Sequence, residues 1–115
     1  MKVSCLQMNM NLGCPEENFA HAELLICNAM KDNADVLVLP ETWITGFFPI
    51  DILAELSCRN GYEVNNRIGD LAKKYTVNIV AGSVSNVRGG KVYNTAFVFD
   101  RDPAGRCMLC RRAQC

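Results

Sequence analysis

The 115-residue sequence lacks several features that mark specialised classes of protein. It has no excess of charge, because 12 basic residues balance 12 acidic ones, whereas nucleic-acid-binding proteins carry a basic patch or stripe. No apolar run reaches the roughly 20 residues that a membrane-spanning helix needs. There is no internal repeat, and the N-terminus lacks the long apolar stretch of a signal peptide. These absences predict a cytoplasmic protein that binds neither nucleic acid nor membrane.

The composition that remains is that of a folded protein. Half of the residues are apolar and 21% are charged, which is typical of globular domains and unlike disordered or fibrous chains. A chain of this length is one domain or part of one, and it can bury about two-thirds of its unfolded surface.

Helix-like and strand-like segments alternate over the first two-thirds of the sequence. Phe19, Ala22 and Ile26 recur at helical spacing after Pro15, a residue that suits the first helical turn. Residues 36–39 form an apolar run of strand length, typical of a strand buried on both faces. This alternation predicts an α/β fold. The other predicted elements are a strand over 3–10, a short helix over 50–56, a helix over 64–75, a strand over 77–82, a hairpin over 84–99 that turns at Gly89 and Gly90, and a strand starting in 106–110.

A single glutamate is the first candidate functional residue. Glu41 follows the predicted strand 36–39 directly and precedes Trp43 and Phe47. In α/β sheets, ligands bind at the carboxyl ends of the strands, and a carboxylate walled by aromatic rings suits a general base. Taken alone, this pattern is more typical of a solvated loop glutamate beside core aromatics.

Further segments of the sequence change that interpretation through their order. They are Val3-Ser4-Cys5-Leu6-Gln7-Met8-Asn9, Asn18-Phe19, Asp35-Val36-Leu37-Val38-Leu39-Pro40-Glu41, Thr45-Gly46-Phe47, Ile79-Val80-Ala81-Gly82-Ser83 and Tyr93-Asn94-Thr95-Ala96. With these six segments the chain resembles the nitrilase, or carbon–nitrogen hydrolase, superfamily along nearly its whole length. The resemblance implies the N-terminal half of a four-layer αββα sandwich: a mixed β-sheet with helices packed on one face.

The resemblance also implies a reaction. The family uses a glutamate, a lysine and a cysteine, and the glutamate falls on Glu41. It takes the proton from the thiol and later activates water, while the thiolate attacks an amide or nitrile carbon and the lysine stabilises the developing charge. Trp43 and Phe47 are the candidate pocket residues. The implied substrate is a small-molecule amide or nitrile, with an amide favoured, and no cofactor or metal is implied.

The resemblance fails near the C-terminus. Where the family has Tyr-x-Lys-x-His-Leu, this chain has residues 110–115, Cys-Arg-Arg-Ala-Gln-Cys. Matching residue character puts Arg112 on the lysine as a stand-in, whereas counting from Gly105 puts Ala113 there. None of the seven cysteines lies in the family's nucleophile context. We therefore expect residues 1–115 to be a partial domain, truncated before the nucleophilic cysteine and inactive as it stands.

Two other interpretations follow from the same residues. Cys107, Cys110 and Cys115 resemble part of a metal or redox site, but structural zinc takes four ligands, so we expect reduced thiols, no disulfide and no metal. Half of a sandwich would leave one sheet face uncovered, and such a face favours association. The alternative function is a non-catalytic fragment that binds itself or an intact relative, and we expect a homo-oligomer.

Overall fold

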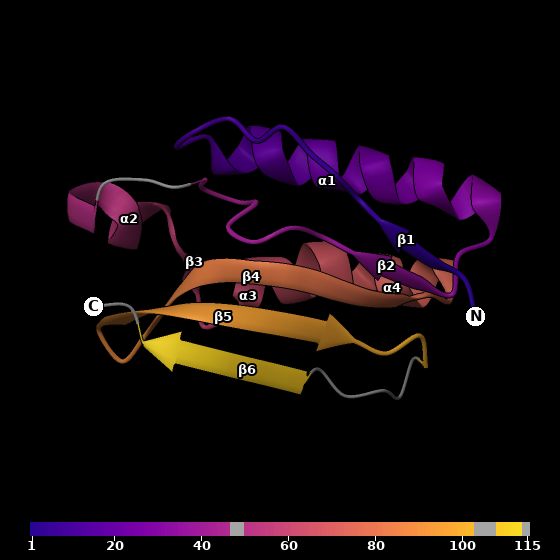
Figure 1. Ribbon diagram of the computed structural model, residues 1–115. Coiled ribbons are helices and arrows are strands. Elements are labelled where there is room, and N and C mark those ends of the chain that lie inside the picture. The colour runs from indigo at the N-terminus through magenta and orange to yellow at the C-terminus, as the bar shows by residue number, and fades with distance from the viewer. Residues whose placement is uncertain (47–49, 103–107, 114–115) are drawn as a thin grey trace.

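The computed structural model describes residues 1–46, 50–102 and 108–113, with residues 50–51 and 108–113 described as backbone alone (Figure 1). A mixed β-sheet and the helices that cross over it form one α/β unit, as the sequence predicted. The elements in chain order are β1 (Val3–Cys5), α1 (Pro15–Ala29), the 3₁₀ turn η1 (Met30–Asp32), β2 (Val36–Val38), α2 (Ile50–Leu56), β3 (Cys58–Arg59), α3 (Tyr62–Val64), the π-helical segment η2 (Asn65–Gly69), α4 (Asp70–Tyr75), β4 (Asn78–Arg88), β5 (Lys91–Phe99) and β6 (Met108–Ala113).

The sheet has a parallel half and an antiparallel half. Its strand order is β1-β2-β4-β5-β6, and β3 pairs with β4 off this path. Strands β1, β2 and β4 are parallel, because α1 and then the α3–α4 segment return the chain to the same edge. Strands β4, β5 and β6 are antiparallel. Gly89 and Gly90 make the tight turn between β4 and β5, as predicted, and both adopt positive φ.

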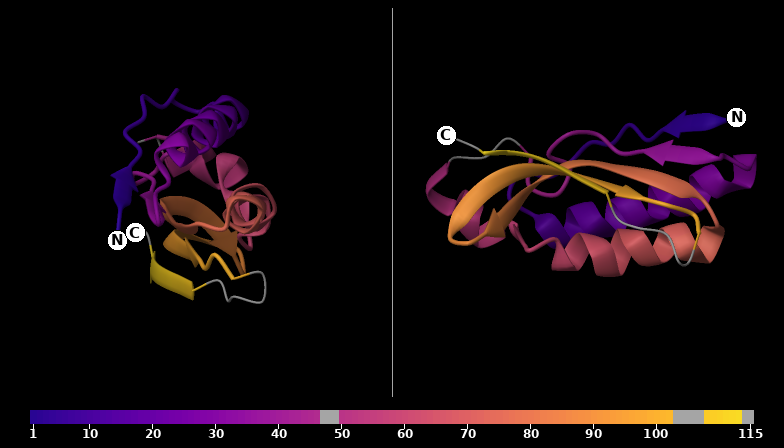
Figure 2. Two further views of the ribbon diagram at one scale, coloured as in Figure 1. Left: turned by 90° about the vertical axis from the view of Figure 1, so that its right-hand side faces the viewer. Right: turned by 90° about the horizontal axis from the view of Figure 1, so that it is seen from below.

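All the long helical segments lie on one face of the sheet. Figure 2 shows α1 and the α3–α4 segment together on that side. Burial alternates accordingly along β5, where Phe97 and Phe99 are buried and Val98 between them is half-buried. Among the apolar residues of the strands, Ile79, Phe97 and Phe99 are buried, whereas Val36, Val38 and Val80 are half-buried.

Helix α1 forms where the sequence predicted it, for the predicted reasons. Pro15 occupies its first turn, where the missing N–H costs nothing, and two glutamates stand at its positive end. Phe19, Ala22 and Ile26 form its buried stripe. The helix ends through the η1 turn at Asn33, which adopts the left-handed conformation with φ 54°. None of the helices in the described ranges is long and apolar enough to cross a membrane.

The fold differs from the sequence prediction in β1, β4 and β3. Strand β1 ends at Cys5, whereas the predicted strand reached residue 10. Residues 78–88 form one continuous strand, not a strand that ends at residue 82, because its register with β5 shifts between Val80 and Ser83 without ending the pairing. The chain also forms the two-residue strand β3, which the sequence did not predict. The continuation of β4 past residue 82 and the presence of β3 have no local sequence signal, since both depend on pairing with a distant strand.

Candidate active site

Glu41 lies just beyond the C-terminal end of β2, where the sequence predicted it. The backbone of this segment continues alongside β4: the Leu39 N–H donates to the Val80 carbonyl at 2.9 Å, and the Thr42 N–H donates to the Ser83 carbonyl at 2.7 Å. Glu41 itself forms an isolated parallel bridge with Ser83. Glu41 therefore lies in a loop that is bound to the sheet by backbone hydrogen bonds both before and after it in the sequence.

Gly82 allows the backbone of β4 and the backbone of the Glu41 loop to approach each other closely. Its φ is +56°, and a Cβ atom built there would lie 2.0 Å from the Pro40 carbonyl oxygen and 2.8 Å from that of Leu39. Any side chain would collide with the backbone that carries Glu41. Glycine at this position is thus required by the geometry of the candidate site, and not only by its backbone conformation.

The Glu41 side chain is exposed and has one hydrogen-bond partner among the described residues. Asn94 in β5 donates from Nδ2 to Glu41 Oε1 at 2.9 Å. Along β5, Asn94 alternates with the buried Thr95 and Phe97, so it points away from the helices. The contact therefore places the Glu41 carboxylate at the helix-free face of the sheet.

Trp43 does not line a cavity beside Glu41, contrary to the expectation from the sequence. Its side chain is fully buried on the helix-covered side, with its indole N–H bonded to the Ala81 carbonyl at 3.0 Å. Its ring meets that of Phe19 edge to face, with the centroids 5.0 Å apart. The reason is a local reversal: Thr42 adopts φ 53° and sends the next residue beneath α1. Trp43 is thus a core residue.

The other candidate residues from the sequence lie at or beyond the limits of the description. Phe47 falls outside the described residues. The backbone of Arg112 pairs with Asn94 in the β5–β6 register, whereas that of Ala113 pairs with Tyr93. The register therefore places Arg112, of the two alternatives, opposite the residue that contacts Glu41.

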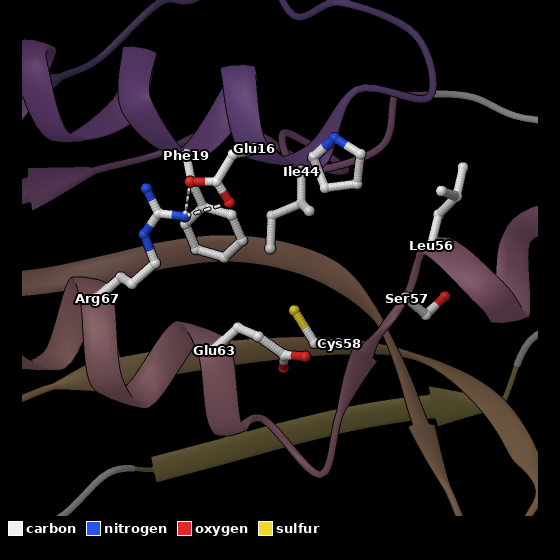
Figure 3. A pocket seen from close by; sticks show the side chains of 9 residues that line it. Glu16, Phe19, Ile44, Leu56, Ser57, Cys58, Glu63 and Arg67 are labelled. Atoms are coloured by element: carbon white, nitrogen blue, oxygen red, sulfur yellow. Dashed lines mark hydrogen bonds and ion pairs between the residues drawn. The ribbon is translucent and has the colours of Figure 1, made fainter.

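A separate pocket of about 130 Å³ opens on the helix-covered side (Figure 3). Glu41 is not among its lining residues, which are Pro15, Glu16, Phe19, Ile44, Leu56, Ser57, Cys58, Glu63 and Arg67. Arg67 closes one side, where its guanidinium pairs with both carboxylate oxygens of Glu16 at 2.8 and 2.9 Å and stands 4.4 Å from the centroid of the Phe19 ring. Its charge is thus already neutralised by the protein.

The cysteine in this pocket is not an activated nucleophile. Burial raises the pKa of the Cys58 thiol to about 12, and the neighbouring Glu63 carboxylate adds to the rise. A catalytic cysteine needs the opposite, a lowered pKa that yields thiolate near neutral pH. Cys5 and Cys27 are exposed free thiols, and Cys14 is a partly exposed one.

Comparison with known proteins decides the family. The sequence model of the carbon–nitrogen hydrolase family matches residues 2–107 of the chain. The chain belongs to the carbon–nitrogen hydrolase family. The 2-oxoglutaramate amidase of Bacillus subtilis is 42% identical over 100 residues, which cover 87% of this chain and 38% of that relative. The "hydrolase in agr operon" of Staphylococcus aureus is 38% identical over 97 residues, which cover 84% of this chain and 37% of that relative.

Solved structures show the same carbon–nitrogen hydrolase fold. Nit3 of Saccharomyces cerevisiae, a nitrilase superfamily member, superposes with a TM-score of 0.83 at 23% identity, covering 99% of this chain and 44% of Nit3. The NitN amidase of a Nesterenkonia species superposes with a TM-score of 0.80 at 20% identity, covering 99% and 44%. The chain therefore spans less than half the length of the relatives and structures that it matches.

Two residues that contact or adjoin the Glu41 loop were present in the segments that carry the family resemblance, without an assigned role. Asn94 lies in Tyr93-Asn94-Thr95-Ala96 and Gly82 lies in Ile79-Val80-Ala81-Gly82-Ser83. Sequence distance hid both roles, since Glu41 and Asn94 are 53 residues apart. The available signal was polarity, because Asn94 interrupts the apolar alternation of a predicted strand.

Proposed function

We propose that this chain contributes the general base of an enzyme that hydrolyses non-peptide carbon–nitrogen bonds in small amides. The observation that carries the proposal is the placement of Glu41: a carboxylate beyond the end of a parallel strand, held by a donor from the sheet. Relatives named 2-oxoglutaramate amidase and omega-amidase support an amide substrate over a nitrile.

The proposed mechanism is nucleophilic catalysis through a thioester. The Glu41 carboxylate accepts the proton of a cysteine thiol, and the thiolate attacks the amide carbon while a cation stabilises the charge on the oxygen. The C–N bond breaks, the amine leaves with a proton returned by the glutamic acid, and a thioester remains. Glu41 then takes a proton from water, whose oxygen attacks the thioester, so that the carboxylic acid leaves and the thiol is restored.

This chain on its own supplies only part of that machinery. Its Lys-equivalent position holds Arg112 or Ala113, and arginine is planar and larger than the ammonium that it would replace. Cys58 is the buried thiol of the described part, and its raised pKa disfavours the thiolate. We therefore propose that the 115-residue polypeptide alone has no turnover, and that Glu41 acts with a cysteine and a cation from outside the matched region.

A chimeric enzyme tests this proposal directly. The segment of the Bacillus subtilis 2-oxoglutaramate amidase that aligns with this chain is replaced by the matching residues of this chain, including Glu41. We expect the chimera to release ammonia from 2-oxoglutaramate, and the Glu41→Gln chimera to lose this activity by at least about 100-fold, the lower end of the range for a general base. A chimera that unfolds cooperatively but keeps its full activity after the Glu41→Gln substitution would contradict the proposal.

A second candidate function is supported by the helix-free face of the sheet. Val3 is 49% exposed there, and Val36, Val38 and Val80 are half-buried. Such a face favours self-association or binding to an intact relative. Sedimentation velocity of the purified chain distinguishes monomers from oligomers. We expect oligomers that Val80→Lys dissociates and that the control substitution Lys91→Glu, at the exposed end of the hairpin, leaves intact. A monomer at all concentrations would refute self-association.

A further inference from the structure

We propose that Asn94 is a positioning residue that orients the Glu41 carboxylate for proton transfer. This inference rests on the proposed role of Glu41 as general base. The contact between Asn94 Nδ2 and Glu41 Oε1, 2.9 Å long, joins two residues that no local sequence pattern connects.

The chemistry of the two groups decides which atom donates in this contact and which carboxylate oxygen remains available. An ionised carboxylate only accepts hydrogen bonds, so the asparagine must present its Nδ2 group and not its Oδ1 atom. Oε1 of Glu41 is thereby occupied. Oε2 has no hydrogen-bond partner in the described part of the chain, and it is the oxygen left to accept the proton.

The two side chains differ in how firmly the backbone beneath them is held, and this difference explains why the contact matters for catalysis. Asn94 stands on β5, which is paired with β4 at Ser85 on one side and with β6 at Arg112 on the other. Glu41 extends from a loop with three rotatable side-chain bonds and is otherwise exposed. A short side chain on a doubly paired strand therefore limits the orientations of a long and flexible one. Proton transfer depends steeply on such orientation.

An unpartnered buried oxygen on Asn94 itself argues that this side chain does more than stabilise the sheet. Three buried side-chain oxygens lack a hydrogen-bond partner within the described ranges: Thr42 Oγ1, Asn94 Oδ1 and Thr95 Oγ1. These three residues are Asn94 itself and the sequence neighbours of Glu41 and Asn94. Asn94 Oδ1 belongs to the residue that contacts Glu41, whereas Thr95 alternates with Asn94 along β5 and points to the helix-covered side. A buried oxygen without a partner costs stability, so the stability of the sheet alone does not account for an asparagine at position 94.

Two Asn→Asp substitutions in the same sheet form a matched pair for the test. Asn94→Asp replaces the Nδ2 donor by an oxygen and places a like charge beside Glu41. Asn78 uses its other atom, since its Oδ1 accepts the Arg101 N–H at 2.8 Å, so Asn78→Asp keeps its bond. The two variants change the net charge equally, but only Asn94→Asp removes a donor that binds a carboxylate and sets a second carboxylate beside Glu41.

The first measurement uses the 115-residue chain and needs no activity. The Asn94 side-chain amide resonances are followed by ¹H–¹⁵N NMR during acidification, in the wild type and in Glu41→Gln. We expect a shift that follows the protonation of one carboxyl group in the wild type and disappears in Glu41→Gln. Asn94 resonances that are unaffected by the Glu41 substitution would overturn the inference.

The second measurement uses the active chimera and separates positioning from packing. We expect Asn94→Asp to lower kcat by about 10- to 100-fold, the loss of one hydrogen bond to a charged group, with KM changed by less than about twofold because the base acts in the transition state. Asn78→Asp should keep kcat within about twofold of the chimera. Equal kcat values for the two variants would overturn the inference. An inactive wild-type chimera would reject the proposed function instead, and the NMR result would still decide whether Asn94 holds Glu41.

Discussion

Replacement of Gly82 by alanine tests whether the backbone beneath Glu41 is as tightly packed as the structure shows. An L-residue at φ +56° costs about 1–2 kcal/mol in conformational energy, partly offset by about 0.4–1 kcal/mol from the stiffer unfolded chain. The new Cβ would also lie 2.0 Å from the Pro40 carbonyl oxygen, and overpacking against backbone costs about 1–3 kcal/mol more. We expect the free energy of unfolding to fall by about 2–4 kcal/mol in total.

Gly89 provides the matched control, because its φ is +57° and nothing lies within 4 Å of its virtual Cβ. Gly89→Ala carries the conformational cost alone, so we expect a loss of about 1 kcal/mol or less. Urea unfolding followed through the fluorescence of Trp43, the single tryptophan and a fully buried one, measures both variants. If the two alanine variants lose the same stability, the close approach of Gly82 to the Glu41 loop is refuted.

Three further predictions concern the pocket and the chain as a whole. Arg67→Leu should lower the free energy of unfolding by about 1–2 kcal/mol, since it removes partly exposed ion pairs and a cation–π contact; Arg67→Lys should recover only part, and no loss in urea unfolding would contradict this. The Cys58 thiol titrates near 9.0 when unfolded and about 12 when folded, so the unfolded chain loses its proton first. The free energy of unfolding should therefore fall as pH rises from 9 to 12, by at most about 1.4 kcal/mol per pH unit, with a shallower slope in Cys58→Ala; identical slopes would disprove the assignment. The purified 115-residue chain should release no ammonia from simple aliphatic amides; release that Glu41→Gln abolishes would show that this chain has its own nucleophile.

Local patterns predicted the elements whose residues interact with near neighbours. Helix α1 follows from Pro15 and the apolar spacing of Phe19, Ala22 and Ile26, and the β4–β5 turn follows from two adjacent glycines. The position of Glu41 beyond β2 followed from an apolar run that ends at a proline. These features depend on backbone preference and periodic burial, which a single segment carries.

Contacts between distant segments decided the surroundings of individual side chains, which the local patterns left open or predicted wrongly. Trp43 looked like a pocket wall beside Glu41, yet a positive φ at Thr42 turns it into the core under α1. Cys58 looked like any other thiol until burial and the Glu63 carboxylate set its high pKa.

The sequence by itself indicated the family and the α/β class and singled out Glu41 as the candidate general base, because ordered motifs and periodicity are properties of the chain read in one direction. Only the tertiary structure decided what holds that carboxylate. Asn94 reaches Glu41 because β4 lies between their strands and sets the register that connects them. Gly82 admits the Glu41 loop because two backbones meet at its missing side chain. Both relations are distances between segments, and such distances exist only once the sheet has formed.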